Sequence, residues 1–152
     1  MDLDKGQPHL LIVEDDDIDF ETFVRLARKS AAAHPVQIQR CANGEEALDC
    51  LYGRGPYHQE PTREHPRLIF LDLNLPKCDG RAVLQAREQD PNLRTIPVIV
   101  LSASDNTDDV KFCYQHGANS YLTKQFNLEQ FANALNTTFS YWLTSVILPP
   151  PA

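Results

Sequence analysis

Residues 69–80 read Ile-Phe-Leu-Asp-Leu-Asn-Leu-Pro-Lys-Cys-Asp-Gly, and the fold prediction starts from this stretch. The apolar run 68–71 is continuous rather than alternating, which is typical of a strand buried on both faces. Asp72 stands where this run ends, and Pro76 with Asp79-Gly80 indicates a turn into a helix. Ligands bind at the carboxyl ends of the strands in an open parallel sheet, so Asp72 is the first candidate functional residue.

Short apolar strands alternate with segments of helical period along the rest of the chain. The expected strands cover residues 9–13, 36–41, 68–71, 97–101 and 119–123. The expected helices cover residues 18–31, 44–51, 81–89, 107–116 and 127–142, and residues 53–66 read as a long loop. Such alternation predicts one α/β domain with a doubly wound, five-stranded parallel sheet and helices on both faces. In the flavodoxin-like strand order 2-1-3-4-5, the first and third strands are neighbours.

Helix ends are expected at residues with capping side chains or glycine. Asp16 or Asp17 is predicted to cap the first helix, and Asp105 or Thr107 the fourth. Gly117 then supplies a left-handed residue that ends the fourth helix.

Composition limits the function classes. The 152 residues, 42% of them hydrophobic, predict one domain at 9–144, preceded by a polar leader at 1–8 and followed by an apolar tail at 145–152. The net charge of -7 argues against a nucleic-acid partner. The four cysteines have no paired spacing and no signal peptide precedes them, which favours reduced thiols in the cytoplasm. No apolar stretch reaches the roughly 18 residues of a membrane span.

Acidic side chains gather at the predicted carboxyl edge of the sheet. Glu14 and Asp15 end the first strand, and the predicted strand order brings them toward Asp72. Carboxylates about 4 to 5 Å apart repel by about 3 to 4 kcal/mol per pair at an effective dielectric near 20. A hard divalent cation relieves this repulsion, so we expect Mg²⁺, for which Mn²⁺ can substitute. Asp16 and Asp17 are explained equally well as a solvated helix start.

The fourth and fifth strands end in Ser102 and Lys124, which adds a hydroxyl and an ammonium to the same edge. Together these groups indicate a phosphoryl site. Asp72 is the expected nucleophile, because a carboxylate can attack phosphorus and form an acyl phosphate. Lys124 is expected to pair with Asp72 at rest and with a phosphoryl oxygen afterwards, while Ser102 donates to another oxygen.

The motifs that carry a family resemblance lie in order along the chain. They are Leu-Ile-Val-Glu-Asp-Asp at 11–16, Leu-Asp-Leu-Asn-Leu-Pro at 71–76 with Asp79-Gly80, Ser102-Ala103, and Tyr-Leu-Thr-Lys at 121–124. Over about residues 9–140 the chain resembles the receiver domains of two-component response regulators in single-domain form. The resemblance implies that Asp72 accepts a phosphoryl group from a sensor histidine kinase. It also implies no enzymatic turnover beyond self-catalysed phosphotransfer and autodephosphorylation.

The resemblance implies a ligand set for Mg²⁺. Asp15, Asp72 and the backbone carbonyl of Asn74 would ligate the cation, and Glu14 would act directly or through water. Asn74 and Ser104 match positions that tune self-dephosphorylation in this family.

The resemblance also implies a switch around the phosphoryl group. Ser102, Ala103 and Lys124 would surround that group, and Tyr121 would turn inward beside Ser102. The signal would leave by the face of the fourth helix, fifth strand and fifth helix. Tyr121 is alternatively a half-buried strand aromatic whose hydroxyl finds a partner.

One position departs from the family pattern. The family usually has Lys-Pro where this chain has Lys124-Gln125. A cis bond before a residue other than proline costs about 3 to 4 kcal/mol, so the bond is either trans with an altered loop or cis under strain.

Within the family, the loop 53–66 and the ending from Phe139 onward resemble cyanobacterial phytochrome response regulators. The kinase would then be of phytochrome type. Apolar residues of the ending would lie beyond the domain core, and we expect them to form an isologous homodimer. The predicted contact residues are Phe139, Trp142, Leu143, Val146 and Ile147. The alternative is that the tail folds back on its own chain.

Three other functions remain to be weighed. A phosphatase of the haloacid-dehalogenase type also uses a strand-end aspartate, but it needs a second acid where Asn74 stands. A flavin binder needs a glycine- and hydroxyl-rich loop after the first strand, where this chain has four acids. A phosphate-independent interaction module would keep the fold alone, and the presence of Asp15, Asp72 and Lys124 counts against it.

Overall fold

The computed structural model describes residues 8–30, 35–57, 65–124 and 126–150. One parallel sheet holds five strands in the order β2-β1-β3-β4-β5, as predicted from the sequence. The strands are β1 (His9–Val13), β2 (Gln37–Cys41), β3 (Leu68–Asp72), β4 (Val98–Ser102) and β5 (Ser120–Thr123). All five residues of β3 and of β4 are buried, which agrees with their continuously apolar sequences.

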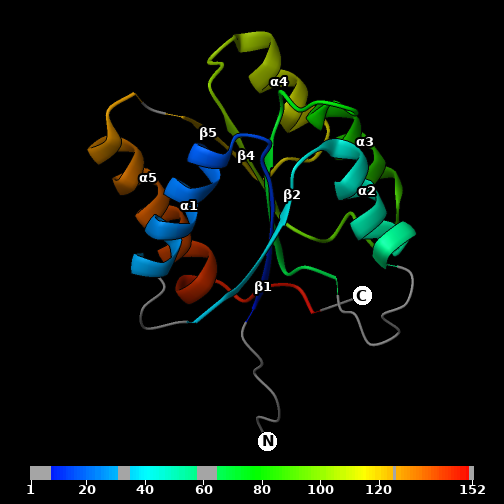
Figure 1. Ribbon diagram of the computed structural model, residues 1–152, viewed down its shortest axis with the longest axis horizontal. Helices are drawn as coiled ribbons and strands as arrows, with labels where there is room; N and C mark the ends of the chain where they lie inside the picture. The colour runs from blue at the N-terminus through cyan, green and yellow to red at the C-terminus, as the bar shows by residue number, and fades with distance from the viewer. Residues whose placement is uncertain (1–7, 31–34, 58–64, 125, 151–152) are drawn as a thin grey trace, which may run out of the picture.

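Helices cover both faces of the sheet (Figure 1). One layer contains α1 (Asp17–Ser30) and α5 (Leu128–Ser140), and the other contains α2 (Gly44–Tyr52), α3 (Gly80–Gln89) and α4 (Thr107–Gln115). The short helix η1 (Gly55–Tyr57) lies inside the predicted 53–66 loop, and the π-helix η2 (Tyr141–Ser145) continues α5. The fold is therefore the predicted doubly wound α/β arrangement.

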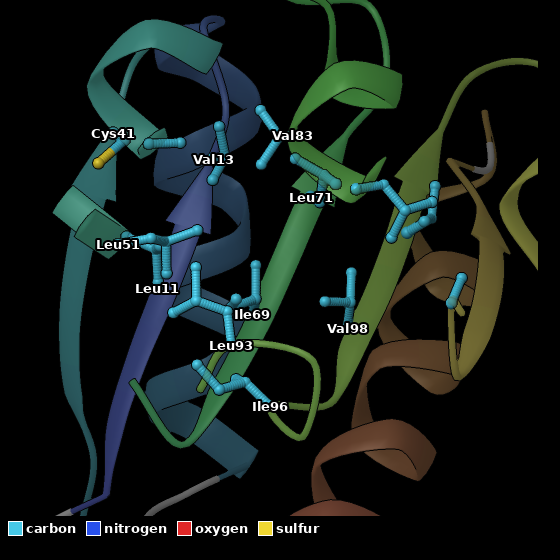
Figure 2. Close-up of a cluster of buried hydrophobic side chains, with 14 of the residues drawn as sticks. Leu11, Val13, Cys41, Leu51, Ile69, Leu71, Val83, Leu93, Ile96 and Val98 are labelled. Carbon is cyan, nitrogen blue, oxygen red and sulfur yellow. The ribbon is translucent and has the colours of Figure 1, made fainter. Parts of the chain in front are cut away.

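The hydrophobic core has two halves, because successive strand residues point to opposite faces of the sheet. The half beneath α2, α3 and α4 is mainly aliphatic (Figure 2). The half beneath α1 and α5 centres on Phe23, Phe70 and Phe139, whose ring centroids lie 4.8 to 5.4 Å apart. Each buried phenylalanine contributes roughly 1.5 to 3 kcal/mol, so this contact fixes α1 and α5 on the sheet.

Helix caps agree with most of the sequence predictions. The Asp16 carboxylate accepts from the Asp19 amide at 2.8 Å, so Asp16 is the cap of α1. The Asn127 side chain caps α5. The predicted cap of α4 was wrong: Asn106, not Asp105 or Thr107, accepts from the Asp108 amide at 2.8 Å, because the helix itself begins at Thr107.

The described tail folds back on its own chain. Arg67, just before β3, donates from Nε to the carbonyl of Pro149 at 3.0 Å and from Nη2 to that of Leu148 at 3.4 Å. Phe139 is 1% exposed and belongs to the core of its own chain, which corrects its assignment to a dimer surface. Trp142 and Leu143 pack against the same core and are half-buried.

Several sequence predictions fall partly outside the described residues, among them the helix 18–31 at residue 31 and the tail 145–152 at residues 151–152. The polar leader is described only at Pro8, and the loop 53–66 lacks residues 58–64. The Lys124-Gln125 bond involves a residue beyond the described set. Within the described ranges, no helix combines the length and the apolar character that a membrane crossing requires.

Candidate functional site

The ends of β1 and β3 bring three carboxylates together at the carboxyl edge of the sheet. β1 pairs with both β2 and β3, and Asp72 is the last residue of β3. Carboxylate oxygens of Glu14, Asp15 and Asp72 lie within 4.8 Å of one another. Glu14 and Asp72 are buried and Asp15 is exposed. The sequence therefore predicted this convergence, which follows from the strand order.

Lys124 directly follows β5, the last strand of the sheet, and its side chain contacts these acids. Its Nζ donates to Glu14 Oε2 at 2.7 Å and to Asp72 Oδ2 at 3.2 Å. The Lys124 amide donates to the carbonyl of Ser102 at 2.7 Å, which ties the end of β5 to the end of β4. The ammonium that was expected beside the nucleophile is therefore in contact with it.

Asp19 is a member of this cluster that the sequence analysis missed. Its Oδ2 accepts from Lys124 Nζ at 3.0 Å. Asp19 lies in the first turn of α1, two residues beyond the acids that were treated as a helix start. The available signal was the position of Asp19 one helical turn after Asp16, because residues with this spacing lie on the same face of a helix.

Burial and charge shift the proton affinities of the cluster. Burial, together with the charge of Asp72, raises the pKa of Glu14 to about 7, although the hydrogen bond from Lys124 opposes this rise. Burial alone would lower the pKa of Lys124, but its hydrogen bond to Glu14 and the charges of Asp72 and Glu14 raise it. Lys124 is therefore charged at neutral pH. The carboxyl groups around it outnumber this single positive charge.

This set of groups fits a hard divalent cation. Carboxylate oxygens are the ligands that Mg²⁺ and Mn²⁺ prefer. The single ammonium of Lys124 is shared among three carboxylates, and Asp15 adds a fourth close by. The backbone amide of Asn74 donates to Asp72 Oδ1 at 3.2 Å, which holds the loop after β3 beside the carboxylate. The fit rests on the donor chemistry and on this excess of negative charge.

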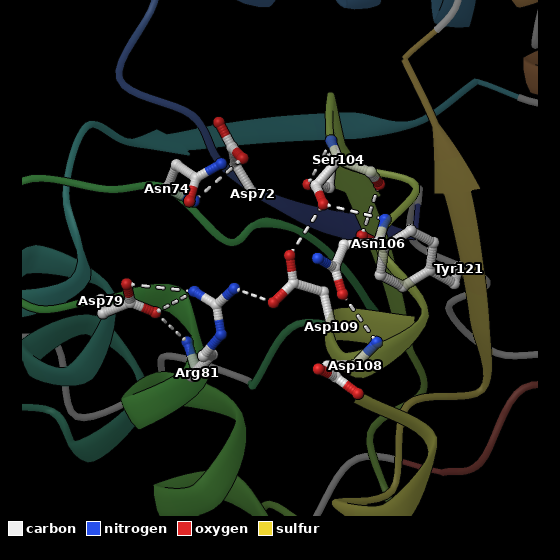
Figure 3. A network of polar contacts seen from close by, with 10 residues as sticks. Asp72, Asn74, Asp79, Arg81, Ser104, Asn106, Asp108, Asp109 and Tyr121 are labelled. Carbon is white, nitrogen blue, oxygen red and sulfur yellow. Dashed lines mark hydrogen bonds and ion pairs between the residues drawn. The ribbon is translucent and has the colours of Figure 1, made fainter. Parts of the chain in front are cut away.

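Ser102 and Tyr121 lie on the other side of Asp72, toward α4. Ser102 is fully buried, and its Oγ accepts from the Ser104 amide at 3.1 Å. The Tyr121 hydroxyl donates to the Ser104 carbonyl at 2.7 Å, and its ring packs against the core (Figure 3). Ala103 is exposed between the two serines. The predicted switch residues thus meet at one loop, between β4 and α4.

A cavity of about 170 Å³ opens beside the acids. Glu14, Asp72 and Lys124 line its polar end, and Phe23 and Phe70 line its apolar end. Pockets for drug-sized ligands and cofactors usually measure about 300 to 1,000 Å³. The cavity is thus smaller than a flavin requires, which disfavours the flavin-binding alternative.

A parallel α/β fold with acids, a lysine and a hydroxyl at the ends of its strands defines a receiver-type phosphoryl site. The chain matches the response regulator receiver domain family over residues 10–136, and it belongs to that family. This membership separates it from phosphatases of the haloacid-dehalogenase type.

Two relatives within the family align with almost the whole of the chain. The chain is 41% identical over 140 residues to response regulator Rcp1 of Synechocystis sp., covering 92% of each protein. It is 34% identical to the probable methanogenesis regulatory protein FilR2 of Methanothrix harundinacea, over 94% of this chain and 88% of that one.

Solved structures agree with this likeness. The phosphorylated cyanobacterial phytochrome response regulator RcpA superposes with a TM-score of 0.84 at 37% identity, over 95% of this chain and all of that one. The Mn²⁺-bound form of Rcp1 superposes with a TM-score of 0.83 at 37% identity, over 94% of this chain and 99% of that one. The predicted likeness to cyanobacterial phytochrome response regulators is therefore confirmed.

Proposed function

We propose that Asp72 is the phosphoacceptor of a two-component phosphorelay and receives its phosphoryl group from a phytochrome-type sensor histidine kinase. The observation that carries this proposal is the contact of Lys124 Nζ with both Asp72 and Glu14, beside a group of three carboxylates. Similarity to Rcp1 and RcpA supports the kinase class. No disulfide joins the four cysteines, which all lie within the described residues, and a reducing, cytoplasmic setting is part of this proposal.

Mg²⁺ is the proposed cofactor, and Mn²⁺ is a substitute for it. Glu14, Asp15, Asp72 and the backbone carbonyl of Asn74 would hold the cation, with Glu14 acting directly or through water. When bound, it supplies positive charge that offsets the charge of the incoming phosphate. The Mn²⁺-bound state of the relative Rcp1 supports this choice of ions.

The residues of the chain have separate roles in the transfer. A carboxylate oxygen of Asp72 attacks phosphorus, the phosphorus–nitrogen bond to the kinase histidine breaks, and the imidazole keeps the electron pair and takes a proton. Lys124 already contacts Asp72 and exchanges this contact for one with a phosphoryl oxygen. The Ser102 hydroxyl and the Ala103 amide are donors to the remaining oxygens. Water later hydrolyses the acyl phosphate, and we expect this autodephosphorylation and the self-catalysed phosphotransfer to be the only reactions of the protein.

The β4–α4 loop is the first part of the molecule to respond. Ser102 ends β4, Ser104 lies in the loop that follows, and the Tyr121 hydroxyl donates to the Ser104 carbonyl. A change in the Ser102 contacts therefore reaches Tyr121 through a single residue. We propose that the signal leaves by the face of α4, β5 and α5.

The domain is proposed to span residues 9–144, with the tail from 145 onward forming a homodimer contact. Ile147 is 98% exposed, and Val146 is half-buried beside it. The hydrogen bonds of Arg67 to the tail support a fixed backbone from which Ile147 projects. We expect Ile147→Asp to convert a dimer to a monomer in sedimentation velocity, with Ile18→Asp as an equally apolar, exposed control. A wild-type monomer over the micromolar range would contradict the dimer.

Intact mass after incubation with acetyl phosphate tests the phosphoacceptor role. We expect one phosphoryl adduct that requires Mg²⁺ and is absent from Asp72→Asn. Asp105→Asn, an exposed acid in the next strand-end loop, is the matched control and keeps the adduct. The absence of any adduct in the wild-type protein would favour the phosphate-independent interaction module instead.

A further inference from the structure

A second polar network lies beside the acid site, between α3 and α4 (Figure 3). Its charged members are Asp79, Arg81 and Asp109, and none of them belongs to the predicted phosphoryl site. The network ends at Ser104, in the loop that carries Ser102. It therefore connects the helix that follows Asp72 with the loop that follows Ser102.

The start of α3 is held tightly against Asp72. A Cβ added to Gly80 would lie 2.2 Å from the Asp72 carbonyl oxygen, so glycine is required for this close approach. The Gly80 amide donates to the Leu73 carbonyl at 2.9 Å. Asp79 caps the helix by accepting from the Arg81 amide at 2.8 Å. Arg81 directly follows Gly80, so its position relative to Asp72 is fixed.

The Arg81 guanidinium bridges two carboxylates from different helices. Nη1 donates to Asp79 Oδ1 at 3.2 Å and to Asp79 Oδ2 at 3.3 Å, while Nη2 donates to Asp109 Oδ1. The planar fork of arginine suits such bridging, because its donors are held in one geometry. Isolated surface ion pairs contribute little, but these side chains are only 25% to 49% exposed and belong to a longer network.

Asp109 passes this constraint to the β4–α4 loop. Its Oδ2 accepts from Ser104 Oγ at 2.7 Å, and the same Oγ accepts from the Asn106 amide at 3.1 Å. Ser104 in turn donates its amide to Ser102 Oγ and accepts the Tyr121 hydroxyl on its carbonyl. The Ser104 amide thus fixes Ser102 Oγ through one of its lone pairs, and the Tyr121 hydroxyl is a second hydrogen-bond partner of Ser102, so the direction of the Ser102 O–H depends on the position of Ser104.

We infer that Arg81 and Asp109 are positioning residues for phosphoryl transfer to Asp72: through Ser104 they orient the Ser102 hydroxyl as a ready donor for a phosphoryl oxygen. The inference rests on the proposed function. Preorganised donors accelerate a reaction because they need no rearrangement in the transition state. Breaking the bridge therefore slows phosphoryl acceptance without removing any group that touches the phosphate.

The test measures the rate of adduct formation by intact mass, with acetyl phosphate and Mg²⁺, in Arg81→Met, Asp109→Ala and the double variant. We expect each single variant to be about fivefold slower, the usual effect of one lost hydrogen bond between neutral groups such as the Ser102 hydroxyl and its partner. The double variant should be no slower than the singles, because both changes break one connection. The half-saturating Mg²⁺ concentration should stay at the wild-type value, since the acidic pocket is untouched.

A second ion pair provides the matched control. Asp49 of α2 and Arg54, just after this helix, pair at 3.4 Å, and Arg54→Met with Asp49→Ala should leave the rate unchanged. Ser104→Ala is a further variant that cuts the connection in a loop, outside any helix, and it should also be about fivefold slower.

Wild-type rates in Arg81→Met, Asp109→Ala and Ser104→Ala would overturn the inference while leaving the proposed function intact. Additive losses in the double variant, or a shifted Mg²⁺ requirement, would also overturn it, because the two residues would then act separately or through the acidic pocket. A wild-type protein that forms no adduct would instead remove the proposed function itself.

Discussion

The most buried cations at the two edges of the sheet, Lys124 and Arg87, have different kinds of partner. At the carboxyl edge, Lys124 is shared by Glu14, Asp19 and Asp72, so negative charge remains in excess. At the amino edge, arginines bind neutral backbone carbonyls. Arg87 donates to the carbonyls of Ile96, Arg94 and Gly117 at 2.8 to 3.1 Å, and Arg67 donates to the tail.

This difference separates a reactive edge from a structural one. Arg87 is 5% exposed, and this burial lowers the pKa of its guanidinium. Its hydrogen bonds nevertheless go to backbone carbonyls, which carry no net charge. Gly117, with φ of +88°, leaves room for that guanidinium, since an added Cβ would lie 2.9 Å from Nη1. The amino edge is thus complete without a ligand, whereas the carboxyl edge gains from a divalent cation that offsets its excess negative charge.

The largest effect is expected for Lys124→Met. The variant keeps an unbranched side chain, shorter by one atom, but removes the donor that contacts Asp72. Loss of one preorganised donor usually slows a reaction by about 10²- to 10³-fold, and we expect the rate of adduct formation to fall by that amount. Intact mass with acetyl phosphate measures it, and Lys111→Met, on an exposed lysine of α4, is the control. A rate within threefold of wild type would remove Lys124 from the mechanism.

At the amino edge, Arg87→Met is expected to act on stability alone. The variant leaves three buried or half-buried carbonyls without their donor, which costs about 3 kcal/mol of the free energy of unfolding. Urea denaturation measures the loss. Arg94→Met, with an exposed side chain, should change stability by less than about 0.5 kcal/mol. A slower adduct formation in folded Arg87→Met would contradict the separation of the two edges.

The smallest of these effects concerns the pH dependence of the carboxyl edge without metal. The pKa of Glu14 is raised from 4.5 to about 7, so the folded protein holds a proton there that the unfolded chain has lost. This group's contribution to stability is present below pH 4.5 and is lost as the pH rises to about 7. From pH 5 to 8, we expect Glu14→Gln to gain about 2 kcal/mol relative to wild type.

Urea titrations in the presence of a chelator measure that gain, and Glu21→Gln, an exposed acid on α1, is the control. We expect Mg²⁺ at pH 8 to reduce the difference in the free energy of unfolding between Glu14→Gln and wild type, because the cation stabilises the charged acid cluster of the wild-type protein. An equal pH dependence in wild type and Glu14→Gln would show that burial does not perturb this carboxyl group.

The main elements of the site were predictable because they follow from local patterns. Asp72, Ser102 and Lys124 each come at the end of a strand, and strand ends of a parallel sheet meet at one edge. The role of Arg87 was not predicted: it lies on the buried stripe of α3 with Val83 and Leu84, and the sequence does not identify the carbonyls that it binds. An arginine on an apolar stripe is nevertheless a signal that backbone carbonyls lie within its reach.

By itself the sequence determined the alternation of strands and helices, the parallel sheet, and the residues that stand at its carboxyl edge. Only the tertiary structure decided which side chains touch. Asp19 meets Lys124 across 105 residues, Arg81 meets Asp109 across 28, and the tail returns to Arg67 across 82. Strand and helix periods are local properties of the chain, whereas such contacts depend on how the helices pack and which rotamers they permit.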